Sequence, residues 1–116
     1  MEKSLVELVR LRASQVNGRA YCVGVHAAEA RKAGDGERRL ATVAVWRETP
    51  FFNDRERAAL AWAESVTRVA DTRVPDGGWE RVQPHFTYAE LVDLTLLVNT
   101  VNASNRFAIA FRKTPA

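Results

Sequence analysis

Two consecutive stretches near the start of the chain decide the fold: ELVRLRASQVNG (Glu7–Gly18) and AYCVGVHAAEARKAG (Ala20–Gly34). Around the first, apolar residues recur over Leu5–Val16 at the three- and four-residue spacing of an amphipathic helix. The pair Asn17–Gly18 interrupts that stripe, which is typical of a helix end. The second stretch is rich in alanine and closes with a glycine, so it predicts a second helix over Arg19–Ala33.

Two capping boxes indicate where longer helices begin, because an Asn or Thr followed three residues later by Glu satisfies free N–H groups of a first turn. They are Asn53 with Glu56 and Thr87 with Glu90. No segment alternates apolar and polar residues with β-branched enrichment, so no strand is predicted. We therefore expect an all-α fold: a single-domain bundle of five to six helices over residues 1–116. The remaining predicted helices cover Glu37–Arg47, Asp54–Ala70 and Thr87–Arg112, with a loop over Asp71–Gly78 and a short helical turn over Trp79–Val82.

The composition is that of an ordinary soluble domain, with 47% hydrophobic and 27% charged residues. The formal net charge is only +3, and Lys and Arg mostly alternate with Glu and Asp. This pattern favours solvated helix faces over a nucleic-acid surface. No signal-peptide block is visible, and the most apolar stretch, Leu91–Val101, is too short to cross a bilayer. The single cysteine permits no intramolecular disulfide, so we expect a cytoplasmic protein. From the charge pattern and the short apolar stretch we expect no nucleic-acid partner and no membrane partner.

Cys22 and His26 are candidate chemical residues because they are four positions apart in a predicted helix. That spacing places both side chains on one face, one turn apart. An imidazole there can accept the thiol proton or stabilise the thiolate, which is the reactive form. Cys22 also lies in the first turn, where the helix dipole favours an anionic sulfur, and Arg19 adds a positive charge three residues earlier.

The same two residues also have a purely structural interpretation. A lone cysteine in a helix is usually a small buried apolar side chain, and a lone histidine is often a hydrogen-bonded core residue. No metal is expected, because one cysteine and two histidines without a carboxylate cluster fall short of a zinc pattern. No cofactor is expected either, because the glycine spacing matches no phosphate-binding loop. We assign no role to His85.

Nearly the whole chain resembles the alkylhydroperoxidase D (AhpD) / carboxymuconolactone decarboxylase family. The two stretches quoted above carry this resemblance, together with AVWRETPFF (Ala44–Phe52), RERAALAWAE (Arg55–Glu64) and FTYAELVDLTLLVNTVNASNR (Phe86–Arg106). The resemblance implies an AhpD-like helical bundle. It also implies a homo-oligomer, a trimer or hexamer, with the Thr87–Arg112 helix contributing to the interface.

The peroxidase branch of this family has a Glu, eleven residues, a Cys, two residues, a second Cys, three residues and a His. By this resemblance, the catalytic residues here are Glu7, Cys22 and His26, with Cys22 at the position that is oxidised to sulfenic acid. The first cysteine of the pattern falls at Arg19. The internal disulfide that is usual in the family therefore cannot form.

Three hypotheses follow. In the first, Cys22 acts as a one-cysteine antioxidant peroxidase, an oxidoreductase in which Glu7 and His26 relay protons and an external thiol reductant resolves the sulfenic acid. In the second, the chain is a catalytically impaired member that serves as a binding or oligomeric scaffold, with Arg19 paired to Glu7. In the third, it is a lactone decarboxylase, a branch that does not depend on a cysteine pair, although the WRETPFF segment is more similar to the peroxidase-type relatives.

Overall fold

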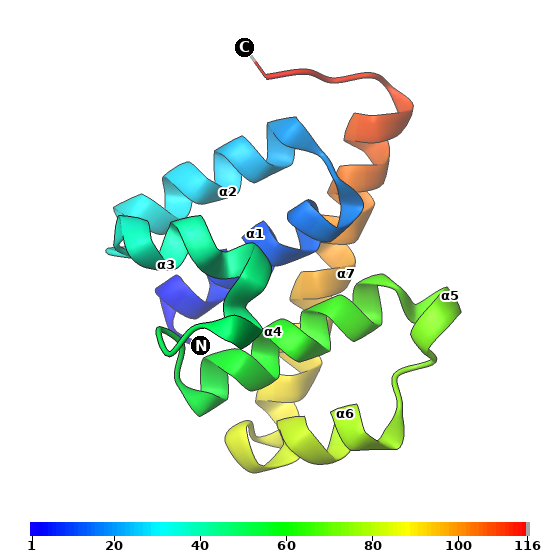
Figure 1. The fold of residues 1–116 in the computed structure, drawn as a ribbon. Helices are drawn as coiled ribbons and strands as arrows, with labels where there is room; N and C mark the ends of the chain where they lie inside the picture. Colours follow the sequence, from blue (N-terminus) through cyan, green and yellow to red (C-terminus); the bar gives the residue numbers. More distant parts are fainter. Residues whose placement is uncertain (116) are drawn as a thin grey trace.

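Helix α1 runs through the middle of the molecule, and the other helices pack around it (Figure 1). The computed structural model describes residues 1–115, and no strand occurs among them. In Figure 1, α2 and α3 lie on one side of α1, α4 and α6 lie on the other, and α7 crosses behind. The helices are α1 (Lys3–Asn17), α2 (Ala20–Lys32), α3 (Glu37–Thr42), the 3₁₀ helix η1 (Val43–Glu48), α4 (Asp54–Thr67), α5 (Val69–Thr72), α6 (Asp76–Val82), the 3₁₀ helix η2 (Gln83–His85) and α7 (Tyr88–Ala110).

The central position of α1 follows from its broad apolar face. Leu5 and Val9 are four residues apart and pack into one core cluster, which contains Trp62 of α4 and residues of α7. Leu8 and Leu11 face a second cluster around the indole of Trp46, and both leucines are almost fully buried. The helix therefore separates two cores and is held on both sides.

Gly18 sets the angle between α1 and α2. Its φ of 70° is in the left-handed region, which glycine adopts without the steric cost of a Cβ. The Gly18 N–H donates to Gln15 O at 3.0 Å, and the Arg19 N–H donates to Ser14 O at 3.1 Å, so two of the last four carbonyls of α1 are satisfied. The chain turns back at once, and α2 packs along α1.

Both predicted capping boxes are confirmed. The Asn53 side chain accepts the N–H of Glu56 at the start of α4, and Thr87 accepts the N–H of Glu90 at the start of α7. In each case the glutamate side chain accepts the backbone N–H of the capping residue in return. These caps explain why the sequence located the starts of the two longest C-terminal helices correctly.

The all-α prediction is confirmed, although residues 1–115 contain more breaks than we expected. The helix predicted over Glu37–Arg47 is split after Thr42, where the chain continues as the 3₁₀ helix η1, and Val45 within η1 adopts the non-helical angles φ −122° and ψ 32°. The helix predicted to reach Ala70 ends at Thr67, and a separate short α5 follows. The predicted loop Asp71–Gly78 contains the start of α6. No helix in the described chain is long and apolar enough to span a membrane.

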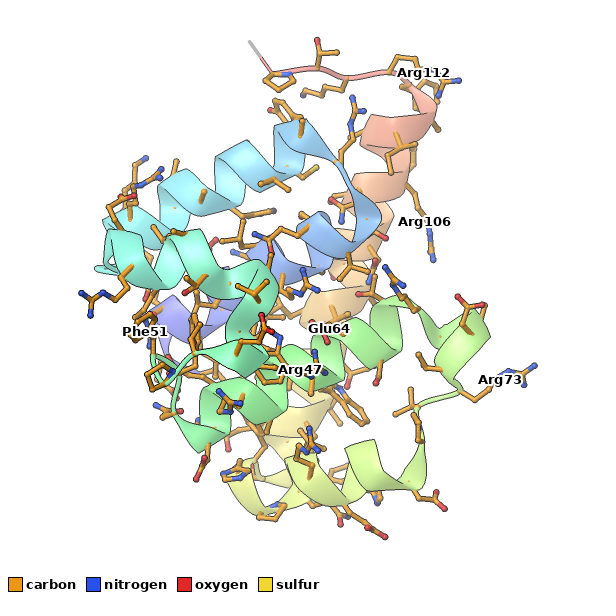
Figure 2. All side chains as sticks on the ribbon, viewed as in Figure 1. Arg47, Phe51, Glu64, Arg73, Arg106 and Arg112 are labelled. Carbon is orange, nitrogen blue, oxygen red and sulfur yellow. The ribbon has the colours of Figure 1, made fainter. Side chains whose placement is uncertain are left out.

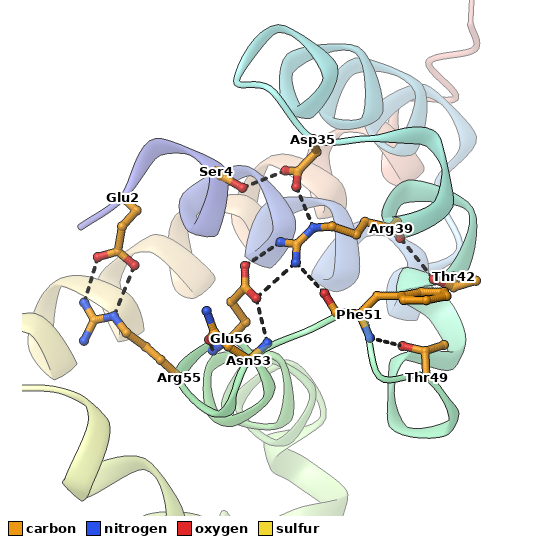
Figure 3. Close-up of polar contacts among 10 residues, drawn as sticks. All are labelled: Glu2, Ser4, Asp35, Arg39, Thr42, Thr49, Phe51, Asn53, Arg55 and Glu56. Atoms are coloured by element: carbon orange, nitrogen blue, oxygen red, sulfur yellow. Dashed lines mark hydrogen bonds and ion pairs between the residues drawn. The ribbon is translucent and has the colours of Figure 1, made fainter.

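A polar cluster around Arg39 joins the N-terminal half of the chain to α4 (Figure 3). The Arg39 guanidinium donates to Asp35 at 2.9 Å, to the backbone oxygen of Phe51 at 2.6 Å and to Glu56. Asp35 also accepts from Ser4 Oγ at 2.8 Å, so α1 is joined to the same cluster. These bonds fix the connection between α2 and α4, and with it the orientation of α2 against α1.

Candidate functional site

Cys22 lies in the first turn of α2 and is only 6% exposed. Its free thiol lines an apolar groove of about 400 Å³ between the start of α2 and the end of α7. The Nζ of Lys113 lies 4.4 Å from the centre of the Tyr21 ring in the same groove. A ligand in this groove would therefore meet the sulfur, aromatic surface and one positive charge. The groove is lined by Tyr21, Cys22, Ser104, Phe107, Ala108, Phe111 and Lys113.

Glu7 lies at the interface of α1 and α2 and is 4% exposed. Its Oε1 accepts from Arg10 at 2.6 Å, and its Oε2 faces Nδ1 of His26 at 3.5 Å. The second distance is long for a hydrogen bond, and neither atom has another partner within residues 1–115. The structure thus brings Glu7 and His26 together, as the family pattern implies, and adds Arg10 on the far side of the carboxyl.

Burial and charge act on His26 in opposite directions. Desolvation is the largest effect and lowers its pKa, Glu7 raises the pKa in part, and Arg10 lowers it again. The net pKa lies below the ordinary value of 6.5, so the imidazole is mostly neutral at neutral pH. A neutral imidazole can carry its proton on Nδ1 toward Glu7 and accept a proton at Nε2.

Cys22 and His26 share one face of α2, one turn apart, but no hydrogen bond joins the thiol and the imidazole in the described chain. The thiol faces the groove beside α7, whereas the imidazole lies close to the Glu7 carboxyl. A proton passing between them would need a bridging water or a small side-chain rotation.

Arg19 precedes α2 and has extended backbone angles. Its carbonyl accepts the N–H of Val23 at 2.9 Å, whereas its buried Nε has no partner within residues 1–115. The ion pair between Arg19 and Glu7 that we considered is not formed within residues 1–115, and Glu7 pairs instead with Arg10, one turn along α1. Arg19 therefore remains a positive charge at the start of the cysteine helix.

Two contributions to this site were not predicted from the sequence. Arg10 was assigned no role, although its i, i+3 spacing from Glu7 is a direct signal for a helical ion pair. The groove residues of α7, and Lys113 beyond it, lie more than eighty positions from Cys22 in sequence and carry no local signal. Within the described residues, no three Cys, His, Asp or Glu side chains come together as a metal site would require.

The fold and the site define a class: a small all-helical protein with a buried cysteine and a half-buried histidine one turn apart on its second helix, opposite a buried glutamate. A sequence model of the carboxymuconolactone decarboxylase family matches residues 1–65, more than half of the chain. The chain belongs to this family.

The chain is also similar to individual proteins. The uncharacterized protein YdfG of Bacillus subtilis is 40% identical over 104 residues, which cover 90% of this chain and 71% of YdfG. The uncharacterized protein YnjA of Escherichia coli is 34% identical over 100 residues, which cover 86% of this chain, and the match spans about half (54%) of YnjA. A crystal structure from Agrobacterium tumefaciens, of a protein of unknown function described as a candidate antioxidant defence protein AhpD, is 38% identical with a TM-score of 0.97. It matches all of this chain, which covers 80% of that structure.

Proposed function

We propose that the chain is a one-cysteine thiol peroxidase, in which Cys22 reduces hydroperoxides and His26 and Glu7 handle the protons. The observation that carries this proposal is the placement of Cys22: in the first turn of α2, on an open groove, one turn from an imidazole that faces a buried carboxyl. The free N–H groups at a helix start favour an anionic sulfur. The description of the Agrobacterium relative as an antioxidant defence protein supports the same chemistry.

The proposed reaction begins when the neutral imidazole of His26 accepts the thiol proton, directly or through water. The Cys22 thiolate attacks the outer oxygen of a hydroperoxide, the O–O bond breaks, and the sulfur becomes a sulfenic acid. His26 returns the proton to the departing alkoxide, which leaves as an alcohol. Glu7 accepts from Nδ1–H of His26 when the gap closes and so stabilises the transient imidazolium.

Resolution of the sulfenic acid requires an external thiol in this proposal, because the chain has no second cysteine. One thiol displaces water from the oxidised Cys22 and forms a mixed disulfide, and a second thiol releases the reduced enzyme and a disulfide product. Arg19 and Lys113 are positive charges close to the cysteine in sequence and in the groove, respectively. They favour an approaching thiolate over a neutral thiol.

We further propose that the chain works as a homo-oligomer, a trimer or hexamer. The outer face of α7 carries large apolar side chains that are mostly exposed, Leu96 at 62% and Phe107 at 67%. Tyr88, Val92 and Leu96 are four residues apart, and Phe107 follows three helical turns later, so all four lie along one side of α7. An exposed apolar stripe of this length is typical of a surface that another subunit covers.

Peroxide consumption with a small thiol as reductant tests the peroxidase proposal. We expect wild type to turn over and Cys22→Ser to fall to background, with His26→Gln about 100-fold slower because general acid–base catalysis supplies roughly that factor. His85→Gln is the matched control, since it removes the other histidine of the chain, and it should keep wild-type rates. Equal background rates in wild type and Cys22→Ser would contradict the proposal.

Equal background rates in wild type and Cys22→Ser would instead favour the second candidate, a family member that binds or assembles without turnover. The observations behind this alternative are Arg19 in place of the first cysteine, and a thiol that makes no hydrogen bond to His26 within residues 1–115. Lactone decarboxylation is tested separately by product formation from a carboxymuconolactone, and a lack of turnover in that assay would remove it.

A further inference from the structure

Arginines surround two hollows on the face formed by η1, α4, α5 and α6, away from the Cys22 groove. The first hollow, of about 480 Å³, is lined by Arg47, Arg57 and Arg81, with His85 and Asp54. The second, of about 350 Å³, is lined by Arg12, Arg47, Arg68 and Glu64. Arg47 lines both, so the two hollows adjoin, and Figure 2 shows it beside Glu64 on the near face of the molecule. Neither hollow shares a lining residue with the groove that contains Cys22.

The carboxylate of Glu64 is already engaged by protein donors. It accepts from Arg12 Nε at 2.7 Å, from Arg47 at 2.6 Å and from the indole of Trp46 at 3.0 Å. Burial opposes its ionisation, but these donors outweigh the burial and hold the pKa of Glu64 below its usual value. Glu64 is therefore ionised, but its single charge is shared between two arginines.

The other arginines of this face lack carboxylate partners. The Arg57 guanidinium donates to three backbone oxygens, those of Trp46, Arg47 and Thr49, which use three of its five N–H donors without neutralising its charge. Arg68 and Arg81 form no ion pair within residues 1–115. Five arginines line the two hollows and only two carboxylates accompany them, which leaves an excess of three positive charges. That excess equals the formal net charge of the whole chain.

We infer that these two hollows bind a small polyanion, a molecule that carries at least two phosphate or carboxylate groups, one in each hollow and both next to Arg47. A guanidinium presents paired N–H donors that match the geometry of both oxyanions. Arg57 is fixed by its bonds to the backbone and by the indole face of Trp46, whose ring centre is 5.1 Å from its central carbon. It would therefore lose little side-chain freedom on binding. The volumes are those of a small-molecule site.

Calorimetric titration with inorganic pyrophosphate and with citrate at low ionic strength tests this inference. At least one of the two should bind with 1:1 stoichiometry per chain, and inorganic phosphate should bind much more weakly because its single phosphate group cannot occupy both hollows. Arg68→Ala and Arg81→Ala should each weaken binding about tenfold, since a hydrogen-bonded charge lost at one hollow costs roughly that factor. Arg38→Ala is the matched control, because Arg38 is an exposed arginine that lines neither hollow.

The indole N–H signals in an NMR spectrum locate the bound ion. Trp46 Nε1 donates to Glu64 beside both hollows, whereas Trp62 Nε1 donates to Thr95 and lines neither. The first signal should shift on titration and the second should not. Binding of pyrophosphate alone assigns phosphate groups to the ligand, and binding of citrate alone assigns carboxylates; either supports the site. Absence of binding by both ions, equal affinity for inorganic phosphate, or equal weakening by Arg38→Ala would overturn it. Cys22→Ser should leave every result unchanged, which separates this site from the peroxidase proposal.

Discussion

Oε2 of Glu7 and Nδ1 of His26 face each other across 3.5 Å, and neither atom has a hydrogen-bond partner among the described residues. The other oxygen of the same carboxyl is held by Arg10 at 2.6 Å. The carboxyl thus lies between a permanent cation and a group that can become one. The negative charge of Glu7 raises the pKa of His26 and the positive charge of Arg10 lowers it, so the protonation of His26 depends on both residues.

Substitutions at the two neighbours should move the His26 pKa in opposite directions. Glu7→Gln removes a negative charge that raises this pKa, so the pKa should fall further below 6.5. Arg10→Gln removes a positive charge that lowers it, so the pKa should rise. NMR titration of the imidazole carbon-bound protons measures both shifts. Glu37→Gln is a control, because Glu37 is an exposed carboxylate paired with Arg31 and does not act on His26. Shifts of the same sign in Glu7→Gln and Arg10→Gln would contradict this electrostatic picture.

His26 should also make folding stability depend on pH near neutrality. Its pKa is lower in the folded chain than the ordinary 6.5 of an exposed imidazole, mainly because of burial. The unfolded chain therefore binds more protons below that value, and the free energy of unfolding falls as the pH drops through it. Urea unfolding at about pH 7.5 and about pH 5.5 should show this loss, and it should be smaller in His26→Gln. Identical losses in the two proteins would assign the pH dependence to other groups.

The start of α7 offers a test of the capping box. Thr87→Ala removes the side-chain oxygen that accepts the N–H of Glu90, and it should lower the free energy of unfolding by about 1 kcal/mol. Thr100→Ala is a matched control on the same helix. Its hydroxyl bonds only to Leu96 O within the helix, so its loss should be neutral or slightly stabilising. Urea unfolding measures both, and equal effects would show that the cap contributes nothing.

Local sequence signals predicted the helices, but only part of the site. The capping residues and Gly18 located helix ends because they act on N–H and C=O groups within a few positions. The end of α3 at Thr42 and the non-helical angles of Val45 carry no such signal, because no glycine or proline lies between Glu37 and Arg47. Glu7 was located by family resemblance rather than by its own surroundings. The groove beside Cys22 depends on where α7 ends in space, which local patterns do not encode.

A charge on the outer face of α7 should dissociate the homo-oligomer. Leu96 is 62% exposed at the middle of the apolar stripe, so Leu96→Arg should place an unpaired charge in the proposed interface and yield a smaller species. Val69→Arg is the control, since Val69 is 48% exposed on α5, outside the stripe. Light scattering coupled to size exclusion gives the mass of each. A monomeric wild type, or an oligomer unaffected by Leu96→Arg, would contradict the proposed interface.

Arg19→Cys should convert the one-cysteine chemistry into a two-cysteine cycle. The substitution introduces a thiol three residues before Cys22 at the helix start, where the family pattern has its first cysteine. After Cys22 is oxidised, the introduced thiol should attack the sulfenic sulfur, release water and close an internal disulfide. Intact mass after peroxide treatment should then show the loss of two hydrogens, whereas wild type should retain one added oxygen that a sulfenic-acid reagent traps.

Ala20→Cys is the matched control for that experiment. Position 20 is two residues from Cys22, and side chains at that spacing do not face each other on a helix. Its introduced thiol should therefore not resolve the sulfenic acid within the same chain. A disulfide that forms equally in both variants would indicate nonspecific oxidation. Failure to trap an oxidised Cys22 in wild type would show that the thiol does not react with peroxide. The chain would then be the catalytically impaired family member, with Arg19 in place of the first cysteine.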